Sequence, residues 1–185
     1  MIAARSMNLL VRARSTMTRV QNNPFRTVKG NPMPPEKCHL LQFDGASNPN
    51  PGPSSAGIVV FGPGQRKFLY ERGVFLDHAS NNEAEYKALE LGLESAKELG
   101  IQNLVIEGDS QLVVEQTVGN YKMKSETLRP FYNRVQALLA KNFDYVAIRH
   151  IYRENNTYAD DVTKYVLGTK KSYIEEMARL GVFKV

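Results

Sequence analysis

Four acidic residues stand where carboxylates could be brought together: Asp44, Glu85, Asp109 and Asp160. Asp44 ends one apolar run, CHLLQFD, and Asp109 follows another, NLVIEG. An Asp after a strand is most often a turn former or a helix N-cap, and that alternative applies to Asp109 taken alone. If the four converge, their mutual repulsion requires cations, and carboxylate oxygens are ligands that suit Mg²⁺ or Mn²⁺. The pattern therefore predicts a divalent-metal site.

The segments around these acids predict an α/β domain. Apolar runs bounded by Gly, Pro and Asn indicate strands, and apolar residues at helical spacing indicate helices. We expect a five-stranded mixed sheet, with three antiparallel strands first and helices on both faces. The strands are expected at 38–44, 58–62, 68–76, 103–108 and 145–151, and the helices at 83–99, 111–119, 125–142 and 156–167. Asp44 and Asp109 would then follow strands, whereas Glu85 and Asp160 would lie near helix starts.

A chain of 185 residues suits one domain with extensions, and we place that domain at residues 36–168. The first 35 residues hold six basic and no acidic side chains; because the whole chain carries +5, residues 36–185 carry −1. The Arg- and Ser-rich start predicts a mitochondrial transit peptide followed by a flexible linker, and a basic arm that binds nucleic acid is the alternative. Residues 169–185 are expected to form a C-terminal extension with a short helix, which packs on the domain or meets a protein partner.

Composition excludes several classes of protein. No apolar run approaches the roughly 20 residues of a membrane span, so we expect no membrane partner. Cys38 is the only cysteine, which excludes an intrachain disulfide and a cysteine-based zinc site, and we expect no disulfide-linked partner. If the leader is not an import signal, the cytoplasm or nucleus replaces the mitochondrion as the expected location.

Four segments together resemble one family: FDGASNPNPGPSSAG, NNEAEYKAL, EGDSQLVV and HIYRENNTYADDV. From about residue 40 to residue 167 the chain is similar to the type 1 ribonuclease H family, in its compact branch. The resemblance implies a ribonuclease H-like fold and an endonuclease that hydrolyses the RNA strand of RNA–DNA hybrids, leaving 5′-phosphate and 3′-hydroxyl ends. It implies two Mg²⁺ ions, for which Mn²⁺ could substitute. It assigns Asp44 to both ions, Glu85 and Asp109 to the ion near the leaving group, and Asp160 to the ion that activates water.

The last motif departs from the family. Some members carry a histidine in the loop before the last acid, whereas Arg153 and Glu154 occupy that loop here. His150, at the end of the preceding strand, is predicted to be structural. Asp160 and Asp161 compete for the last ligand position, and consecutive helical residues point about 100° apart, so both cannot face the metals equally. The family pattern favours Asp160.

The same resemblance points to residues that would contact the hybrid. Short amides suit the 2′-hydroxyl of RNA, and basic side chains suit the phosphates of the DNA strand. Turn or cap roles are the alternative for the Asn residues. Arg129 and Arg134 are further candidates for phosphate contacts, and a solvated charge run is the alternative for them. The expected contacts are Gly45, Ser47, Asn50, Ser80, Asn81, Asn82, Lys122 and Lys124.

Three functions compete. The first is the nuclease. The second is a catalytically quiet domain of the same fold that binds RNA or acts as a scaffold in an organellar assembly such as the mitochondrial ribosome. The third, a fragment of a reverse transcriptase, would need a polymerase region that 185 residues cannot supply. A scaffold is free to lose metal ligands, and this chain keeps all four acids, so the sequence favours the nuclease.

Overall fold

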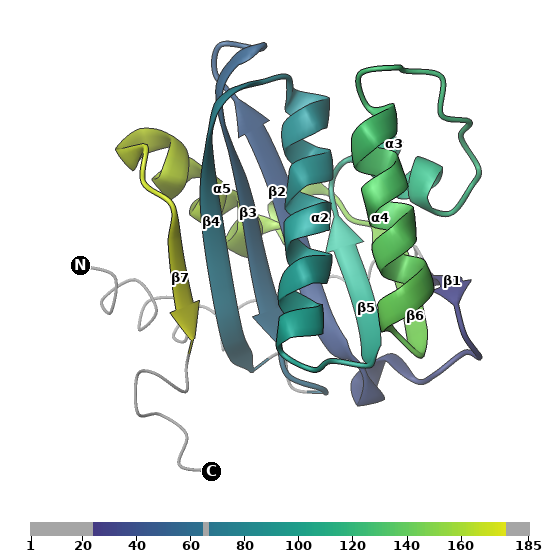
Figure 1. Ribbon diagram of the computed structural model, residues 1–185. Helices are drawn as coiled ribbons and strands as arrows, with labels where there is room; N and C mark the ends of the chain where they lie inside the picture. Colours follow the sequence, from purple (N-terminus) through teal and green to yellow (C-terminus); the bar gives the residue numbers. More distant parts are fainter. Residues whose placement is uncertain (1–23, 65–66, 177–185) are drawn as a thin grey trace.

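A mixed sheet of seven strands forms the centre of the computed structural model, which describes residues 24–64 and 67–176 (Figure 1). The strand order is β1-β6-β5-β2-β3-β4-β7. Strand β2 lies in the middle, antiparallel to β3 and parallel to β5. The strands are β1 (Arg26–Lys29), β2 (His39–Ser47), β3 (Gly52–Phe61), β4 (Phe68–Ala79), β5 (Asn103–Gly108), β6 (Tyr145–His150) and β7 (Tyr173–Glu176).

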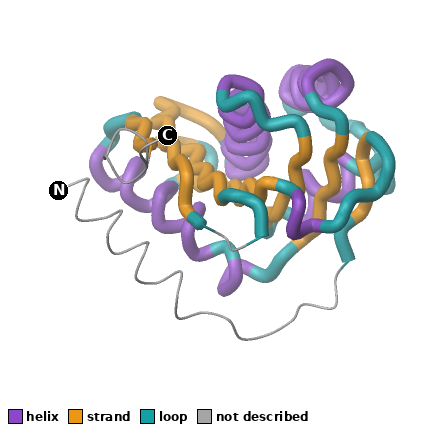
Figure 2. Tube along the Cα trace, turned by 90° about the horizontal axis from the view of Figure 1, so that it is seen from below, coloured by secondary structure: helices purple, strands orange, loops and turns teal. Residues whose placement is uncertain are grey.

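Helices cover both faces of this sheet, as Figure 2 shows from below. Helix α2 packs against β2, β3 and α4 on one face, and α5 packs against β2, β3 and β4 on the other. Buried apolar side chains form one cluster on each face of the sheet. Successive residues of a strand point to opposite faces, so Leu41 and Phe43 on β2 pack on the α2 side and Leu40 packs on the α5 side. The helices are α2 (Asn81–Glu98), α3 (Gln111–Thr117), α4 (Arg129–Asn142) and α5 (Thr157–Thr169), with short 3₁₀ turns at Pro35–Lys37 and Arg153–Asn155.

Local sequence fixes where α2 begins. The Ser80 hydroxyl accepts from the Glu83 backbone N–H, and the Glu83 carboxylate accepts from the Ser80 backbone N–H at 2.7 Å, which together make a capping box. At the other end, Gly100 adopts a φ of +70°, a left-handed conformation that glycine tolerates and that ends the helix. The capping box therefore sets Glu85 in the first turns of a helix that starts at a defined residue.

The predicted fold class is confirmed: a mixed sheet has its antiparallel strands first in the chain and helices on both faces. The five predicted strands are its five central ones, and β1 and β7 add one strand at each edge. The predicted strand count is therefore corrected from five to seven within the described residues.

The two edge strands also correct the predicted extensions. Residues 26–29, expected to be linker, form β1 and pair with β6. Residues 173–176, part of the extension in which a short helix and a tail were expected, form β7 and pair with β4, with Tyr173 opposite Gly73. A strand of four residues is too short to show a period, and the open edge of the neighbouring strand decides its conformation. Residues 1–23, which include the Arg- and Ser-rich start predicted to be a transit peptide, and the last nine residues lie outside the described residues.

Two expectations from composition concern membrane spans and the single cysteine. Among the described residues, none of the helices combines the length and the apolar character that crossing a bilayer requires. Cys38 is buried and its thiol is free. Burial, with the nearby charge of Glu36, raises the pKa of this thiol, as expected for a small core residue rather than a reactive one.

Candidate active site

Three of the four predicted acids meet at one end of the central strands. Asp44, Glu85 and Asp109 each offer a carboxylate oxygen, and these oxygens lie within 4.8 Å of one another. Parallel pairing accounts for two of them: Phe43 on β2 is opposite Gly108, the last residue of β5, so Asp44, the next residue of β2, and Asp109, which follows β5, lie side by side. The group combines the middle of β2, the end of β5 and the start of one helix.

Gly45 explains how Glu85 reaches the strand ends. A Cβ at position 45 would lie 2.2 Å from backbone atoms of Ala84 and Glu85, so a larger residue there would push α2 away. The Gly45 backbone also makes a hydrogen bond with Glu85. Gly45 was predicted to contact the hybrid. In the structure it permits the close approach of α2 that brings Glu85 to Asp44.

Burial and the charges of neighbouring acids perturb the pKa values of Asp44 and Glu85. Burial first, and then the charge of Asp109, raise the pKa of Asp44 to about 7. Burial, with the charges of Asp44 and Asp109, also raises the pKa of Glu85 well above its usual range. Asp44 Oδ2 and Glu85 Oε2 are buried and have no hydrogen-bond partner among the described residues. Unpaired buried carboxylate oxygens that face a third acid fit a divalent cation, which would supply the missing positive charge.

Asp160 lies close to this group but is held by cations of its own chain. Its Oδ1 accepts from Arg153 at 2.8 Å, and its Oδ2 lies 2.5 Å from Lys164 Nζ. Burial opposes the charge of Asp160, but the bonds from Lys164 and Arg153 outweigh it and lower the pKa. The Asp160 charge contributes to the raised pKa of Asp44, so the fourth acid belongs to the same electrostatic site. The adjacent Asp161 is half-buried.

Sequence reasoning missed one residue of the site. Asn156 is fully buried, and its Nδ2 donates to the Phe43 carbonyl at 2.8 Å and to Asp109 Oδ1 at 2.9 Å. It ties the middle of β2, at Phe43, to the metal-ligand candidate Asp109 and orients that carboxylate. The only sequence signal was the pair Asn155-Asn156 before α5, which is also typical of a helix cap. Asn156 does occupy the N-cap position, but its side chain makes no capping bond.

Two further side chains support the strand ends. The Thr163 hydroxyl on α5 lies 3.2 Å from the Asp44 carbonyl and fixes β2 against that helix at Asp44. His150 Nε2 lies 3.1 Å from the backbone oxygen of Asp109, and its ring makes an edge contact with Tyr152. The two printed contacts of His150, to a main-chain oxygen and to a ring, fit the structural role predicted for it.

Three of the predicted contacts lie together: Ser47 at the end of β2, Asn50 in the loop that follows it and Asn81 at the start of α2. Asn81 Oδ1 accepts from the Ser47 backbone N–H at 2.7 Å, and Asn50 Oδ1 accepts from the Asn81 backbone N–H at 3.0 Å. These bonds use the amide oxygens and leave the amide N–H₂ groups of Asn50 and Asn81 as donors. The Ser80 hydroxyl, predicted to bind a DNA phosphate, makes hydrogen bonds with Glu83 in the capping box.

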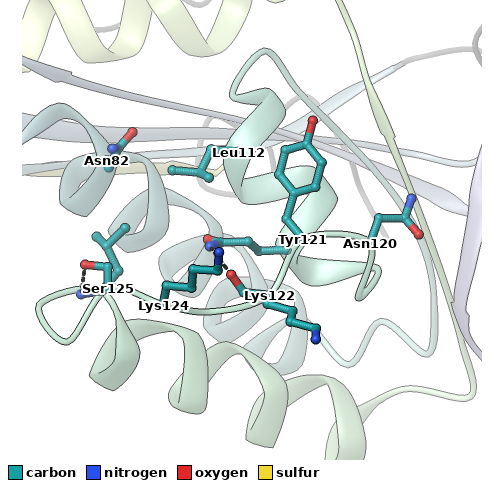
Figure 3. Close-up of a pocket in the computed structure, with 9 residues that line it drawn as sticks. Asn82, Leu112, Asn120, Tyr121, Lys122, Lys124 and Ser125 are labelled. Atoms are coloured by element: carbon teal, nitrogen blue, oxygen red, sulfur yellow. Dashed lines mark hydrogen bonds between the residues drawn. The ribbon is translucent and has the colours of Figure 1, made fainter.

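The remaining predicted contacts line one pocket. Its volume is about 580 Å³, and it lies between the start of α2, helix α3 and the segment that leads to α4 (Figure 3). Asn82, Lys122 and Lys124 are all among its lining residues, and the half-exposed ring of Tyr121 stands beside the lysines. The structure therefore brings Asn82 and the two lysines together, although they come from elements far apart in the chain.

The two nearby arginines lie in ion pairs. Two guanidinium nitrogens of Arg129 donate to the Glu126 carboxylate, and two of Arg134 donate to the carboxylate of the buried Glu90. The Arg134 guanidinium also stacks on the Phe131 ring. For both arginines, these contacts favour the alternative of a surface charge run over a contact with phosphate. Lys122 and Lys124 are the basic side chains that line the pocket.

Comparisons with known proteins agree with this geometry. A family model described as reverse transcriptase-like matches residues 42–166. The bifunctional protein Rv2228c of Mycobacterium tuberculosis is 39% identical over 121 residues, which cover 65% of this chain and 33% of that protein. Ribonuclease HI of Halobacterium salinarum is 38% identical over 125 residues, which cover 68% of this chain and 62% of that protein. The chain thus spans a third of the length of the mycobacterial relative and less than two thirds of the archaeal one.

Solved structures resemble the same region. RNase H1 from Halobacterium salinarum matches with a TM-score of 0.68 and 37% identity, covering 71% of this chain and 98% of that one. LC11-RNase H1, whose structure contains an RNA/DNA hybrid, matches with a TM-score of 0.68 and 27% identity over the same shares. The family match spans more than half of the chain and includes all four acids. The chain therefore belongs to the type 1 ribonuclease H family, the reverse transcriptase-like family of the matching model.

Proposed function

We propose that this chain is an endonuclease that hydrolyses the RNA strand of RNA–DNA hybrids. The observation that carries the proposal is the buried group of Asp44, Glu85 and Asp109, in which two carboxylate oxygens have no protein partner among the described residues. Such a site costs stability unless a cation binds there, so its retention indicates a function. The ribonuclease H relatives, and the hybrid bound by LC11-RNase H1, support the choice of substrate.

The four acids would hold two Mg²⁺ ions, or Mn²⁺ in their place. Bound ions of this kind lower the pKa of a coordinated water and neutralise charge that develops on a phosphate. Asp44 would contribute to holding both ions, Glu85 and Asp109 to holding one of them, and Asp160 to holding the other. Asn156 holds the Asp109 carboxylate in place through its 2.9 Å hydrogen bond. Water-mediated hydrolysis would leave 5′-phosphate and 3′-hydroxyl ends.

The residues around the acids would position the hybrid. Ser47 at the end of β2 and Asn50 in the following loop both make hydrogen bonds with Asn81, so the amide donors lie at the start of α2, the helix that carries Glu85. These donors would bind 2′-hydroxyl groups of the RNA strand. Lys122 and Lys124, in the pocket on the other side of α2's first turn, would bind phosphates of the DNA strand.

The test is cleavage of a hybrid with a labelled RNA strand by the full chain in Mg²⁺ or Mn²⁺. Asp109→Asn keeps the shape of the residue and removes its charge, and Asp144→Asn, at an exposed position between α4 and β6, is the matched control. We expect cleavage by the wild type and the control, none with EDTA, and a loss of about 10²-fold or more with Asp109→Asn. Equal cleavage by Asp109→Asn would refute the metal mechanism, and no cleavage by the wild type would favour the catalytically quiet alternative.

Mitochondrial location is also a proposal, and it rests on the Arg- and Ser-rich first 35 residues. Fluorescent fusions of the full chain and of a chain without residues 1–23 test it. We expect only the full chain to enter mitochondria. A cytoplasmic or nuclear signal from the full chain would overturn the proposal. The shorter deletion is preferred because residues 26–29 form a strand of the sheet.

A further inference from the structure

Strand β1, which lies outside the region matched by the family model, brings an arginine to helix α3. Arg26 Nη1 lies 2.7 Å from Glu115 Oε2, across 89 residues of sequence. The same carboxylate oxygen accepts from Asn120 Nδ2 at 2.8 Å. The Arg26 hydrogen bond is the largest contribution to the lowered pKa of Glu115. One carboxylate therefore joins the edge strand to the residue that follows α3.

Glu115 holds that segment through its backbone as well. The backbone N–H groups of Asn120 and Tyr121 both donate to the Glu115 carbonyl, at 2.9 and 3.1 Å. Gly119 makes the turn with a φ of +84°. Beyond this turn the chain lines the pocket with Tyr121, Lys122 and Lys124. The start of the basic, pocket-lining segment 120–125 is thus anchored to one residue, and that residue is paired with Arg26.

Stability alone does not account for Arg26. Its Nε and Nη2 are buried and have no hydrogen-bond partner among the described residues, and buried unpaired donors are costly. Strand β1 has other attachments: Lys29 Nζ donates to the Ala140 carbonyl at 2.8 Å, and the Phe25 ring lies under the guanidinium of Arg149 on β6. These contacts dock β1 without Arg26, so the ion pair with Glu115 is the distinct contribution of the arginine.

We propose that Arg26 is a positioning residue for hybrid binding: through Glu115 it fixes segment 120–125, so that Lys122 and Lys124 face the DNA strand. The inference rests on the proposed function. It makes β1 a functional part of the enzyme, although β1 lies outside the family match. Arg26 reaches neither substrate nor metal ligand in this scheme, so its loss affects substrate affinity and not the chemical step.

The test compares four single variants, and the double variant of Arg26→Met with Glu115→Gln, in steady-state cleavage of a hybrid. Arg26→Met keeps the aliphatic stem and removes the ion pair, Arg26→Lys restores the charge, and Glu115→Gln removes the other partner. Lys29→Met is the matched control, because it weakens the docking of the same strand without touching Glu115. We expect Arg26→Met and Glu115→Gln each to raise KM about threefold to tenfold, with kcat within about twofold of the wild type. The double variant should raise KM little further than either single variant, and Arg26→Lys should recover part of the lost affinity.

Hydrogen exchange gives a readout that does not depend on activity. Arg26→Met should speed exchange of the Asn120 and Tyr121 amides several-fold, and Lys29→Met should not. Equal KM changes in Arg26→Met and Lys29→Met would reduce Arg26 to a structural role and overturn the proposal. A fall in kcat alone, or unchanged exchange at both amides, would overturn it too. If the wild type cleaves no hybrid, the proposed function fails, whereas the exchange experiment still decides whether Arg26 orders the segment.

Discussion

Replacing Lys164 with methionine should lower the Mg²⁺ concentration at which cleavage reaches half its maximal rate. Lys164 Nζ lies 2.5 Å from Asp160 Oδ2, and Arg153 holds the other oxygen of the same carboxylate at 2.8 Å. A cation that binds Asp160 must displace or weaken these pairs. Methionine keeps most of the aliphatic stem of lysine, so the change removes the competing charge with little loss of packing.

The geometry sets the size of the effect. The Lys164 side chain is 66% exposed, whereas the Asp160 side chain is only 10% exposed. An exposed i,i+4 pair contributes about 0.3–0.5 kcal/mol, and because one partner here is buried we take about 0.5–1 kcal/mol. That free energy corresponds to a twofold to fivefold lower half-saturating Mg²⁺ concentration, at about 1.4 kcal/mol per factor of ten. Arg153 keeps its pair and limits the gain.

Two assays check this. The first is the cleavage rate against Mg²⁺ concentration, and the second is Mn²⁺ binding followed by electron paramagnetic resonance without substrate. Lys141→Met, at an exposed position near the end of α4, is the control for loss of one positive charge. A half-saturating concentration that stays the same or rises in Lys164→Met, or an equal decrease in the control, would refute the competition between Lys164 and metal.

Three further predictions concern stability and the supports of the site. The pKa of Asp44 is raised from 3.8 to about 7, so between these pH values the folded metal-free protein retains a proton that the unfolded chain releases. The free energy of unfolding of the metal-free protein should therefore fall as pH rises from about 4 to about 7, by at most about 4 kcal/mol. Melting in EDTA at pH 5 and pH 8 checks this, and Asp44→Asn should raise the melting temperature more at pH 8. Asn156→Ala should cost about 1–3 kcal/mol in urea unfolding and lower kcat, because Asp109 loses its donor; an unchanged kcat would contradict its orienting role. Tyr173→Phe, which removes a 2.6 Å bond to the buried Glu71, should lower stability by about 1–3 kcal/mol without changing kcat, and a kcat loss would connect β7 to the site.

The central part of the fold could be predicted because its signals are long. Strand β2 is buried on both faces and reads as a continuous apolar run, and α2 has 18 residues with a capping box and a glycine stop. Asp44 and Asp109 directly follow such runs, and Glu85 lies in the well-marked helix. Their convergence then follows from parallel pairing of β2 with β5 and from the close approach that Gly45 allows.

Shorter or long-range features could not be predicted in the same way. Strands β1 and β7 have four residues each, and their conformation depends on the edges of β6 and β4, which are distant in sequence. The bond from Asn156 to Asp109 joins residues 47 positions apart, and nothing local distinguishes that amide from a helix cap. The pair Asp160–Lys164 is different: its i,i+4 spacing is visible in the sequence and could have indicated a competing cation.

The ends of the cleaved RNA test the central claim most directly. A hybrid is cleaved by the full chain with Mg²⁺ in water enriched in ¹⁸O, and the fragments are weighed by mass spectrometry. Hydrolysis by water at the carboxylate site predicts fragments with a 5′-phosphate that carries one ¹⁸O atom and a 3′-hydroxyl, and no product with Asp109→Asn. Fragments that end in 2′,3′-cyclic phosphate and 5′-hydroxyl would show attack by the RNA 2′-hydroxyl instead, and would contradict a site that activates water.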